Sequence, residues 1–252
     1  TSSQPIVLTS NESTPNAGDW GGLIILGRAP INSVTGNATS TSEIASLPYG
    51  GQVVGDDSGI LRYVRVEYSG GAADGQSENN GFSFYGVGNG TSVDYIQAFE
   101  GKDDGIEFFG GTVNVNYASV VNAQDDSIDW TEGYTGSITN AYVKHGESHD
   151  KGIEADGYNT DFSKPIVTNL TIQGLGTAND PDSEAVRLRA GTQGIFNNVL
   201  LIGYAEGFDL DGDMGDSPTG QGVLDGDLSV TDVTFTDIIL QMKNDTGYTF
   251  TE

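Results

Sequence analysis

The chain of 252 residues contains no cysteine, and its ten lysine and arginine residues oppose 36 aspartates and glutamates. Without cysteine, the protein has no disulfide framework, no thiolate metal site and no thiol nucleophile. The net charge of −26 disfavours nucleic acids and anionic membranes as partners, because both are polyanions. No run of 18 apolar residues occurs, so the sequence predicts no membrane-spanning helix and no membrane insertion.

The scarcity of positive charge has a second consequence, which concerns the native state itself. Acidic groups at this density repel one another, so we expect high ionic strength or bound divalent cations to neutralise them. Thr1-Ser2-Ser3-Gln4 is not a signal sequence, and we expect the chain to be a mature, processed or trimmed product.

The chain does contain two short patterns that alternate along it. The first reads apolar, charged, apolar, which is the period of a short strand with one buried face. It occurs five times, at Ile106-Glu107-Phe108, Ile128-Asp129-Trp130, Ile153-Glu154-Ala155, Val186-Arg187-Leu188 and Phe208-Asp209-Leu210.

The second pattern is a longer strand-like segment, and its spacing predicts the fold. Its copies start at Leu61, Val93, Val115, Ile138, Val167, Phe196 and Val230. The shortest interval, from Val93 to Val115, is roughly 22 positions, and longer intervals reflect insertions of varying length, which is typical of a solenoid. We therefore predict an all-β, right-handed parallel β-helix of about seven to nine coils in a single domain, with residues 1–50 as N-terminal strand, cap region and first coil and 51–252 as the repeats.

Aligning the copies predicts the core and the bends. Two inward columns should form the core, one of Phe82, Ile106, Ile128, Ile153, Val186 and Phe208, the other of Phe84, Phe108, Trp130, Ala155, Leu188 and Leu210. Asn140, Asn169 and Asn198 recur at one constant interval, with Asp232 equivalent in the last copy. Asn and Asp tolerate left-handed backbone, so we expect a ladder of side-chain amides along sharp bends. Insertions at 68–80, 156–165, 173–183 and 211–227 should be surface loops.

Several of these segments also carry a family resemblance. Gly18-Asp19-Trp20-Gly21-Gly22 and the run Asp103-Asp104-Gly105-Ile106-Glu107-Phe108-Phe109-Gly110-Gly111-Thr112-Val113 resemble a widespread family of secreted or lipid-anchored bacterial surface proteins. The resemblance implies a right-handed parallel β-helix that is exported and lies outside the cell, on the bacterial surface. It implies no catalytic residue. The chain departs from the family in having no lipid-anchor cysteine.

The outward positions of the first pattern are nearly all acidic, which points to a metal. Stacked coils would place these carboxylates about 4.8 Å apart, and Ca²⁺ takes six to eight oxygen ligands. A solvated acidic face and a catalytic one remain the alternatives. The candidate ligands are Asp103, Asp104, Glu107, Asp125, Asp126, Asp129, Glu154, Asp209, Asp211 and Asp213.

An enzymatic alternative rests on the one region where bases, acids and cations gather. His149, Lys151, Glu154 and Arg187 are the residues that a Ca²⁺-dependent polysaccharide lyase or a glycoside hydrolase would use here. Surface side chains on an inserted turn explain the same pattern without catalysis. We therefore favour a non-catalytic, Ca²⁺-binding, structural protein of the cell surface.

Two further expectations concern partners. Tyr85, Tyr134, Tyr142, Tyr158 and Trp20 could stack on sugar rings, which would make the protein a carbohydrate-binding adhesin. The terminal segments, strand-like at 6–9 and from 230 onward with no amphipathic helix, predict uncapped solenoid ends. We expect subunits to associate through these ends into an extracellular filament or layer, and the alternative is a trimmed domain whose caps lie outside the sequence.

Overall fold

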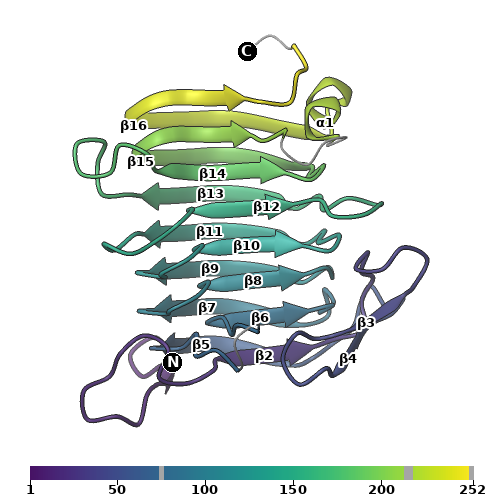
Figure 1. Cartoon of the computed structure of the whole chain (residues 1–252). Coiled ribbons are helices and arrows are strands. Elements are labelled where there is room, and N and C mark those ends of the chain that lie inside the picture. Colours follow the sequence, from purple (N-terminus) through teal and green to yellow (C-terminus); the bar gives the residue numbers. More distant parts are fainter. Residues whose placement is uncertain (74–76, 213–217, 250–252) are drawn as a thin grey trace.

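The computed structural model describes residues 1–73, 77–212 and 218–249. It shows a parallel β-helix, in which the chain climbs coil by coil from one end of the molecule to the other (Figure 1). The predicted fold class is confirmed. Among the described residues there is one short helix, α1 (Thr219–Asp225), and none with the length and apolarity that crossing a membrane requires.

Each coil contributes one short and one long strand. The short strands are β2 (Leu23–Leu26), β6 (Phe82–Tyr85), β8 (Ile106–Phe109), β10 (Ile128–Thr131), β12 (Ile153–Asp156) and β14 (Glu184–Arg189). The long ones are β5 (Ile60–Glu67), β7 (Ser92–Phe99), β9 (Asn114–Val121), β11 (Ser137–Lys144) and β13 (Ile166–Gln173), with the short β1 (Ile6–Leu8) below them. In the upper coils β15 (Gly194–Leu210) and β16 (Leu228–Asn244) each run through both parts without interruption.

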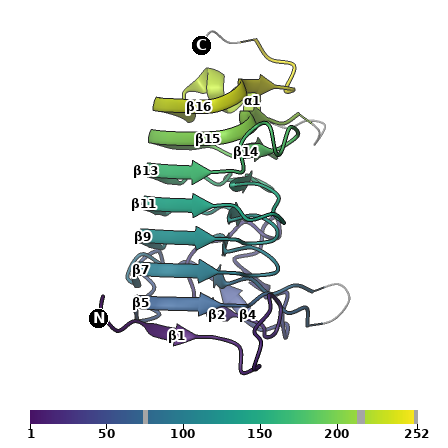
Figure 2. The same ribbon diagram turned by 90° about the vertical axis from the view of Figure 1, so that its left-hand side faces the viewer.

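Strand pairing is parallel and follows the register that the sequence alignment predicts. The long strands stack in the order β1-β5-β7-β9-β11-β13-β15, with β16 on β15 (Figure 2). Leu61, Val93 and Val115 pair in succession, and so do the starts of every later copy. The short strands pair in the order β2-β6-β8-β10-β12-β14-β15. Both predicted core columns face the interior, and each of their residues is at most 2% exposed.

The bend in the middle of each long strand is also regular. Its residue has a left-handed backbone, with φ between 53° and 59° at Tyr63, Tyr95, Tyr117, Asn140, Asn169, Asn198 and Asp232. The amides form the predicted ladder, since Asn198 Nδ2 donates to Asn169 Oδ1 and Asn169 Nδ2 to Asn140 Oδ1, each at 2.8 Å. In the lower coils the three tyrosines replace the amides, with ring centroids 4.8 and 4.4 Å apart. The sequence analysis did not predict this tyrosine stack.

The segment that follows β2, residues 27–50, packs beside the outer face of the short strands. After β2, an antiparallel hairpin of β3 (Thr39–Thr41) and β4 (Pro48–Gly50) projects from the solenoid (Figure 1). Tyr49 of this hairpin packs against Tyr85 and Phe109, which point outward from β6 and β8. The segment also reaches a higher coil, because Asn32 Nδ2 donates to the carbonyl of Thr160 at 2.7 Å. The outer face of the lower short strands is therefore partly covered.

The upper end differs from the prediction in one respect. The insertion at 211–227 was expected to be a surface loop, but it contains α1, which lies beside β16 (Figure 1). Val223 of this helix packs against the core, although no amphipathic helix was expected near either end. A helix of two turns shows too little apolar periodicity to be recognised from sequence.

Candidate functional site

The outer surface of the short strands forms one continuous acidic face. Each coil offers two outward positions, one on the short strand and one three residues before it, which lies in the preceding turn in the lower coils and within β14 or β15 in the upper ones. We call the second of these the turn position. The strand positions, which pair in register, are Ser83, Glu107, Asp129, Glu154, Arg187 and Asp209, followed by Lys243 on β16. The turn positions are Asn80, Asp104, Asp126, Lys151, Glu184 and Glu206.

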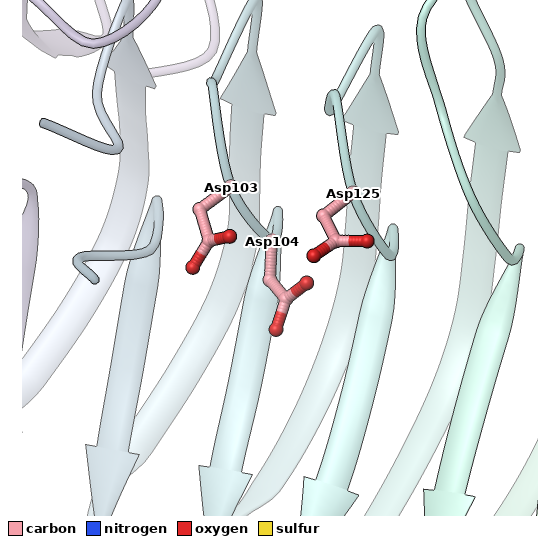
Figure 3. Close-up of side chains that lie close together, drawn as sticks. All are labelled: Asp103, Asp104 and Asp125. Carbon is pink, nitrogen blue, oxygen red and sulfur yellow. The ribbon is translucent and has the colours of Figure 1, made fainter. Parts of the chain in front are cut away.

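In the lower half of this face carboxylates gather that form no ion pair with a cation in the part of the chain that the structure describes. We call Asp103, Asp104, Glu107, Asp125, Asp126 and Asp129 the carboxylate cluster. One carboxylate oxygen from each of Asp103, Asp104 and Asp125 lies within 4.8 Å of the others, across two coils (Figure 3). Asp129 belongs to two such groups, one with Asp104 and Glu107 and one with Asp126 and Glu154. The structure thus brings these predicted ligands together.

Some carboxylate oxygens of the cluster accept hydrogen bonds from the protein, and others do not. Asp104 Oδ1 accepts from the backbone N–H of Asp126 at 3.0 Å, and Asp126 Oδ1 accepts from that of Lys151 at 2.6 Å. The amide of Asn80 donates to Glu107. Asp129 Oδ1, in contrast, is buried and has no hydrogen-bond partner among the described residues. A buried carboxylate oxygen without a partner costs free energy unless a proton or a cation satisfies it.

The electrostatics of the cluster agree with its geometry. Burial raises the pKa of Asp104 and Asp129 well above the usual range, and the neighbouring carboxylates, Glu107 first, raise it further. Burial and nearby acids raise the pKa of Asp103 to about 7 and that of Asp126 to about 8. Six such groups cannot all be ionised near neutral pH without a counter-charge.

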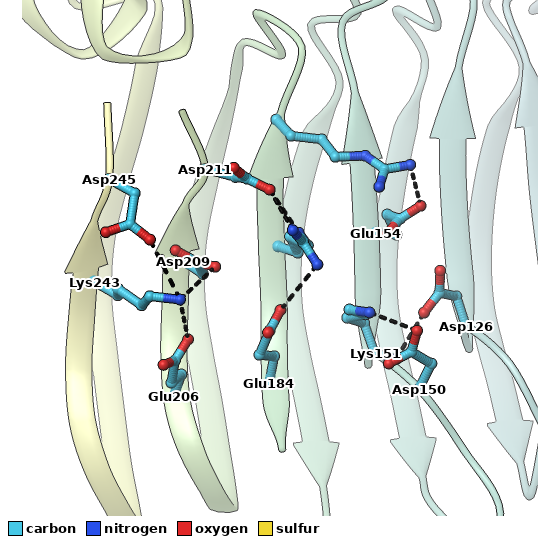
Figure 4. A network of polar contacts seen from close by, with 12 residues as sticks. Asp126, Asp150, Lys151, Glu154, Glu184, Glu206, Asp209, Asp211, Lys243 and Asp245 are labelled. Atoms are coloured by element: carbon cyan, nitrogen blue, oxygen red, sulfur yellow. Dashed lines mark hydrogen bonds and ion pairs between the residues drawn. The ribbon is translucent and has the colours of Figure 1, made fainter. Parts of the chain in front are cut away.

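In the upper half of the face each acidic group faces a cation. Arg187 donates to Asp211 through Nε at 2.8 Å, and Arg189 Nε contacts Asp156 Oδ1 at 2.5 Å while its Nη2 pairs with Glu154. Figure 4 shows Glu154 and Asp211 on this half of the face, with Lys243 beyond them. These five side chains, with Lys243 and its neighbours Glu206 and Asp209, form what we call the paired cluster. Four of the ten lysines and arginines of the chain lie on this half, counting Lys151.

The candidate catalytic bases are engaged in ion pairs. Burial lowers the pKa of Lys151, but the hydrogen bond and charge of Asp150, 2.5 Å away, outweigh it and raise the pKa overall. Arg187 behaves in the same way with Asp211. Both groups are therefore firmly protonated, which suits an electrostatic role rather than removal of a proton.

The two histidines are held as structural groups. His145 is 2% exposed; its Nε2 donates to the Lys151 carbonyl at 3.2 Å and its Nδ1 accepts from the Tyr204 hydroxyl at 2.9 Å. Burial lowers the pKa of His145 to about 3, so this ring stays neutral. His149 donates from Nδ1 to the Gly146 carbonyl and pairs through Nε2 with Asp180 at 2.9 Å. It lines a pocket of about 260 Å³ together with Asp150 and Glu184.

Three expectations from the sequence need correction or qualification. A fully solvated acidic face was one of the alternatives, but the members of the outward column are half-buried, and Asp209 is only 2% exposed. Asp211 is an ion-pair partner of Arg187 and belongs to none of the groups of three carboxylates found among the described residues, and Asp213 lies outside these residues. Tyr85 and Tyr134 were expected to be exposed, yet they are 2% and 0% exposed.

Sequence reasoning also missed residues. Glu184, Arg189 and Lys243 shape the upper half of the face, and none was singled out as a site residue. Arg189 lies two positions after Arg187 and therefore on the same face of the strand. Lys243 lies one coil after Asp209 and pairs with it, so the register would have placed Lys243 in the column of strand positions. Tyr142 and Tyr158 are exposed, at 38% and 46%, as their proposed contact with sugars requires.

Comparison with known proteins identifies the family. A family described as the pectate-lyase like beta helix domain matches the chain over residues 1–252. No curated protein and no solved structure matches it.

Proposed function

Because the chain belongs to the pectate-lyase-like β-helix family, whose fold it has, we propose its function from the acidic face rather than from the fold. We propose that the protein binds divalent cations, Ca²⁺ first among them, at the carboxylate cluster, and that this binding stabilises the lower coils. The observation that carries the proposal is the buried Asp129 Oδ1, which has no hydrogen-bond partner among the described residues, on a side chain that shares its two groups with four further carboxylates.

The donor set fits calcium better than a softer metal. All candidate ligands are carboxylate or backbone oxygens, and cysteine is absent from the chain. Hard cations such as Ca²⁺ prefer such ligands and tolerate irregular geometry with six to eight oxygens. Asp104, Glu107, Asp126 and Asp129 would hold the ion, while the Asn80 amide orients Glu107 from the side.

The role that follows is structural and extracellular. Ca²⁺ sites of extracellular modules have dissociation constants of about 10⁻⁴–10⁻³ M, which suits a protein that meets millimolar calcium outside the cell. A cation bound between two coils links segments that are otherwise joined only by strand pairing and core packing. We propose that the protein acts as a non-catalytic component of the bacterial surface, and its assembly through the solenoid ends stays a prediction.

Thermal unfolding with and without calcium tests the proposal. At a Ca²⁺ concentration fifty times its dissociation constant, binding should stabilise the wild type by about 2 kcal/mol relative to excess chelator. Asp129→Asn should lose most of this gain, because it removes the ligand shared by two groups. Glu12→Gln is the matched control, since it removes one charge from an exposed loop. An equal midpoint in calcium and in chelator would contradict the proposal.

A second candidate, glycoside hydrolysis, is supported by the family and by one feature of the cluster. Asp126, with its pKa raised to about 8, stays protonated at neutral pH as a general acid must. It lies with Asp129 and Glu154 in a group of carboxylate oxygens within 4.8 Å, close to the separation of about 5 Å in retaining enzymes. Incubation with plant and marine polysaccharides should then give new reducing ends, and Asp126→Asn should abolish them. Unsaturated products would instead indicate a lyase.

A further inference from the structure

The uppermost coils contain a second group of carboxylates that was not foreseen. Glu184, Glu206 and Asp209 come from β14 and β15, and one oxygen of each lies within 4.8 Å of the others. Asp209 is 2% exposed, and its Oδ1 is buried without a hydrogen-bond partner among the described residues. Glu184 Oε2 and Glu206 Oε2 are also buried, and the contacts that they make are ion pairs, with Arg187 at 3.9 Å and Lys243 at 3.2 Å.

A lysine side chain points into this group from the last strand. Lys243 lies opposite Asp209 in the β15–β16 register, and its Nζ is 3.2 Å from Glu206 Oε2, 3.3 Å from Asp209 Oδ2 and 3.4 Å from Asp245 Oδ2 (Figure 4). These distances exceed the roughly 2.7–2.9 Å of a strong charge-assisted hydrogen bond. The ammonium therefore acts mainly as a positive charge shared among carboxylates.

This arrangement resembles the carboxylate cluster but differs from it at two positions, since Glu184 corresponds to Asn80 and Lys243 to Asp129. Glu206 and Asp209 hold the same turn and strand positions as Asp104 and Glu107 of the lower coils. In the lower cluster the next coil adds another carboxylate, Asp129, whereas in the upper one it adds Lys243. The lysine thus stands where a cation would complete the group.

We propose that Glu184, Glu206 and Asp209 form a latent divalent-cation site that the Lys243 ammonium closes. Lys243 is then the residue that restricts divalent cations to the lower half of the acidic face. Removing its side chain opens the upper site, because Glu206 and Asp209 lose their closest positive charge, and a hard cation is the ligand that the oxygens of the group suit. Asp245, which is half exposed beside Lys243, is available as a further ligand.

The test is the number of Ca²⁺ ions bound per chain, measured by isothermal titration with CaCl₂ at pH 8. Lys243→Met should bind one more ion than the wild type. Lys243→Met/Asp209→Asn should return to the wild-type number, because it removes the most buried ligand. Lys243→Arg retains the positive charge and should not gain a site.

The outcomes separate this inference from the proposed function, on which its assignment of the lower site rests. If the wild type binds no Ca²⁺ and Lys243→Met binds one ion, the proposed function fails and the latent site stands. If Lys243→Met binds the same number as the wild type while circular dichroism shows it folded, the latent site is refuted. Should Lys243→Met not fold, Lys243→Gln, which keeps a polar side chain of similar length, takes its place under the same criteria.

Discussion

The lower and upper halves of the acidic face differ in how the repulsion between their stacked carboxylates is compensated. Both present carboxylates from equivalent positions of successive coils, with spacing set by strand pairing. In the upper half Arg187, Arg189 and Lys243 neutralise them by ion pairs, whereas none of the six carboxylates of the lower half forms an ion pair with a cation among the described residues. The backbone thus supplies a column of sites, and single side chains decide whether each is an ion pair or a place for an external cation.

The two halves also differ in the loops that surround them. The carboxylate cluster lies in the coils with the shortest intervals, those that begin at Val93 and Val115, so its turns stack directly. The paired cluster lies in the later coils, where the intervals are longer and the insertion at 211–227 adds Asp211 and α1 beside the face. The cations that face the acidic groups of the upper half come from the strands, with Arg187 and Arg189 on β14 and Lys243 on β16.

The largest expected effect comes from breaking the paired cluster. Arg187→Ala removes the guanidinium contacts of Asp211, whose side chain is 3% exposed, and should lower the free energy of unfolding by about 3–5 kcal/mol. Chemical denaturation measures the change. Arg187→Ala/Asp211→Asn should recover part of the loss, because it also removes the buried negative charge. A loss below about 1 kcal/mol would mean that this pair behaves like an exposed one.

The next effect concerns pH and belongs to the lower half. Since the pKa of Asp103 is about 7 and that of Asp126 about 8 in the folded protein, against a usual 3.8, the folded state binds more protons than the unfolded state between these values. Stability in chelator should therefore fall as pH rises from about 4 to about 8. Melting curves across this range check it, and Asp126→Asn should flatten the decline. A midpoint that rises with pH would contradict the raised pKa values.

Two single substitutions, one in each half, should then change the stability in opposite directions. In chelator at pH 8, Asp129→Asn should leave stability unchanged or raise it by about 1 kcal/mol, because it removes one of several repelling carboxylates. Asp209→Asn should lower stability by about 1–2 kcal/mol, because it weakens the hold on Lys243. Parallel denaturation of the two variants decides. Equal signs would show that the two halves do not differ as described.

The smallest effect expected is that of monovalent salt. Raising NaCl from about 0.05 to about 0.5 M in chelator screens repulsion within the carboxylate cluster and should raise the melting midpoint by a few degrees. The gain should shrink in Asp103→Asn/Asp125→Asn, which removes the two more exposed carboxylates of the cluster. An unchanged gain in this variant would assign the effect to the net charge of the whole protein instead.

The fold could be predicted because equivalent positions of successive coils have the same residue character, so the register of the solenoid is visible as a repeat in the sequence. Phe84, Phe108 and Trp130 occupy the same position in successive coils, and their apolar character alone is enough to align them in the sequence. The amide ladder could be predicted for the same reason, since Asn140 and Asn169 keep the constant interval of their coils. The tyrosine stack could not, because a Tyr with a left-handed backbone breaks the expectation that such bends favour Asn, Asp or Gly.

The site was only half predictable, and the reason is again physical. Clustering of Asp104, Glu107 and Asp129 follows from register, so the sequence alone places them together. Burial of that column does not, because the hairpin that flanks it is contributed by residues far away in the chain. The partnership of Arg187 with Asp211 depends on side-chain direction within a coil, which period-two patterns do not contain.

The short coil between Val93 and Val115 has a consequence for how this chain can change its length. Because the two valines occupy the same position on neighbouring levels, excising residues 93–114 would join Ser92 to Val115 in register. Tyr63 would then meet Tyr117, and β6 would meet β10, with each contact of a kind already present in the molecule. A single duplication or deletion of this length can thus add or remove one complete coil of the solenoid, together with the charged side chains that the coil carries.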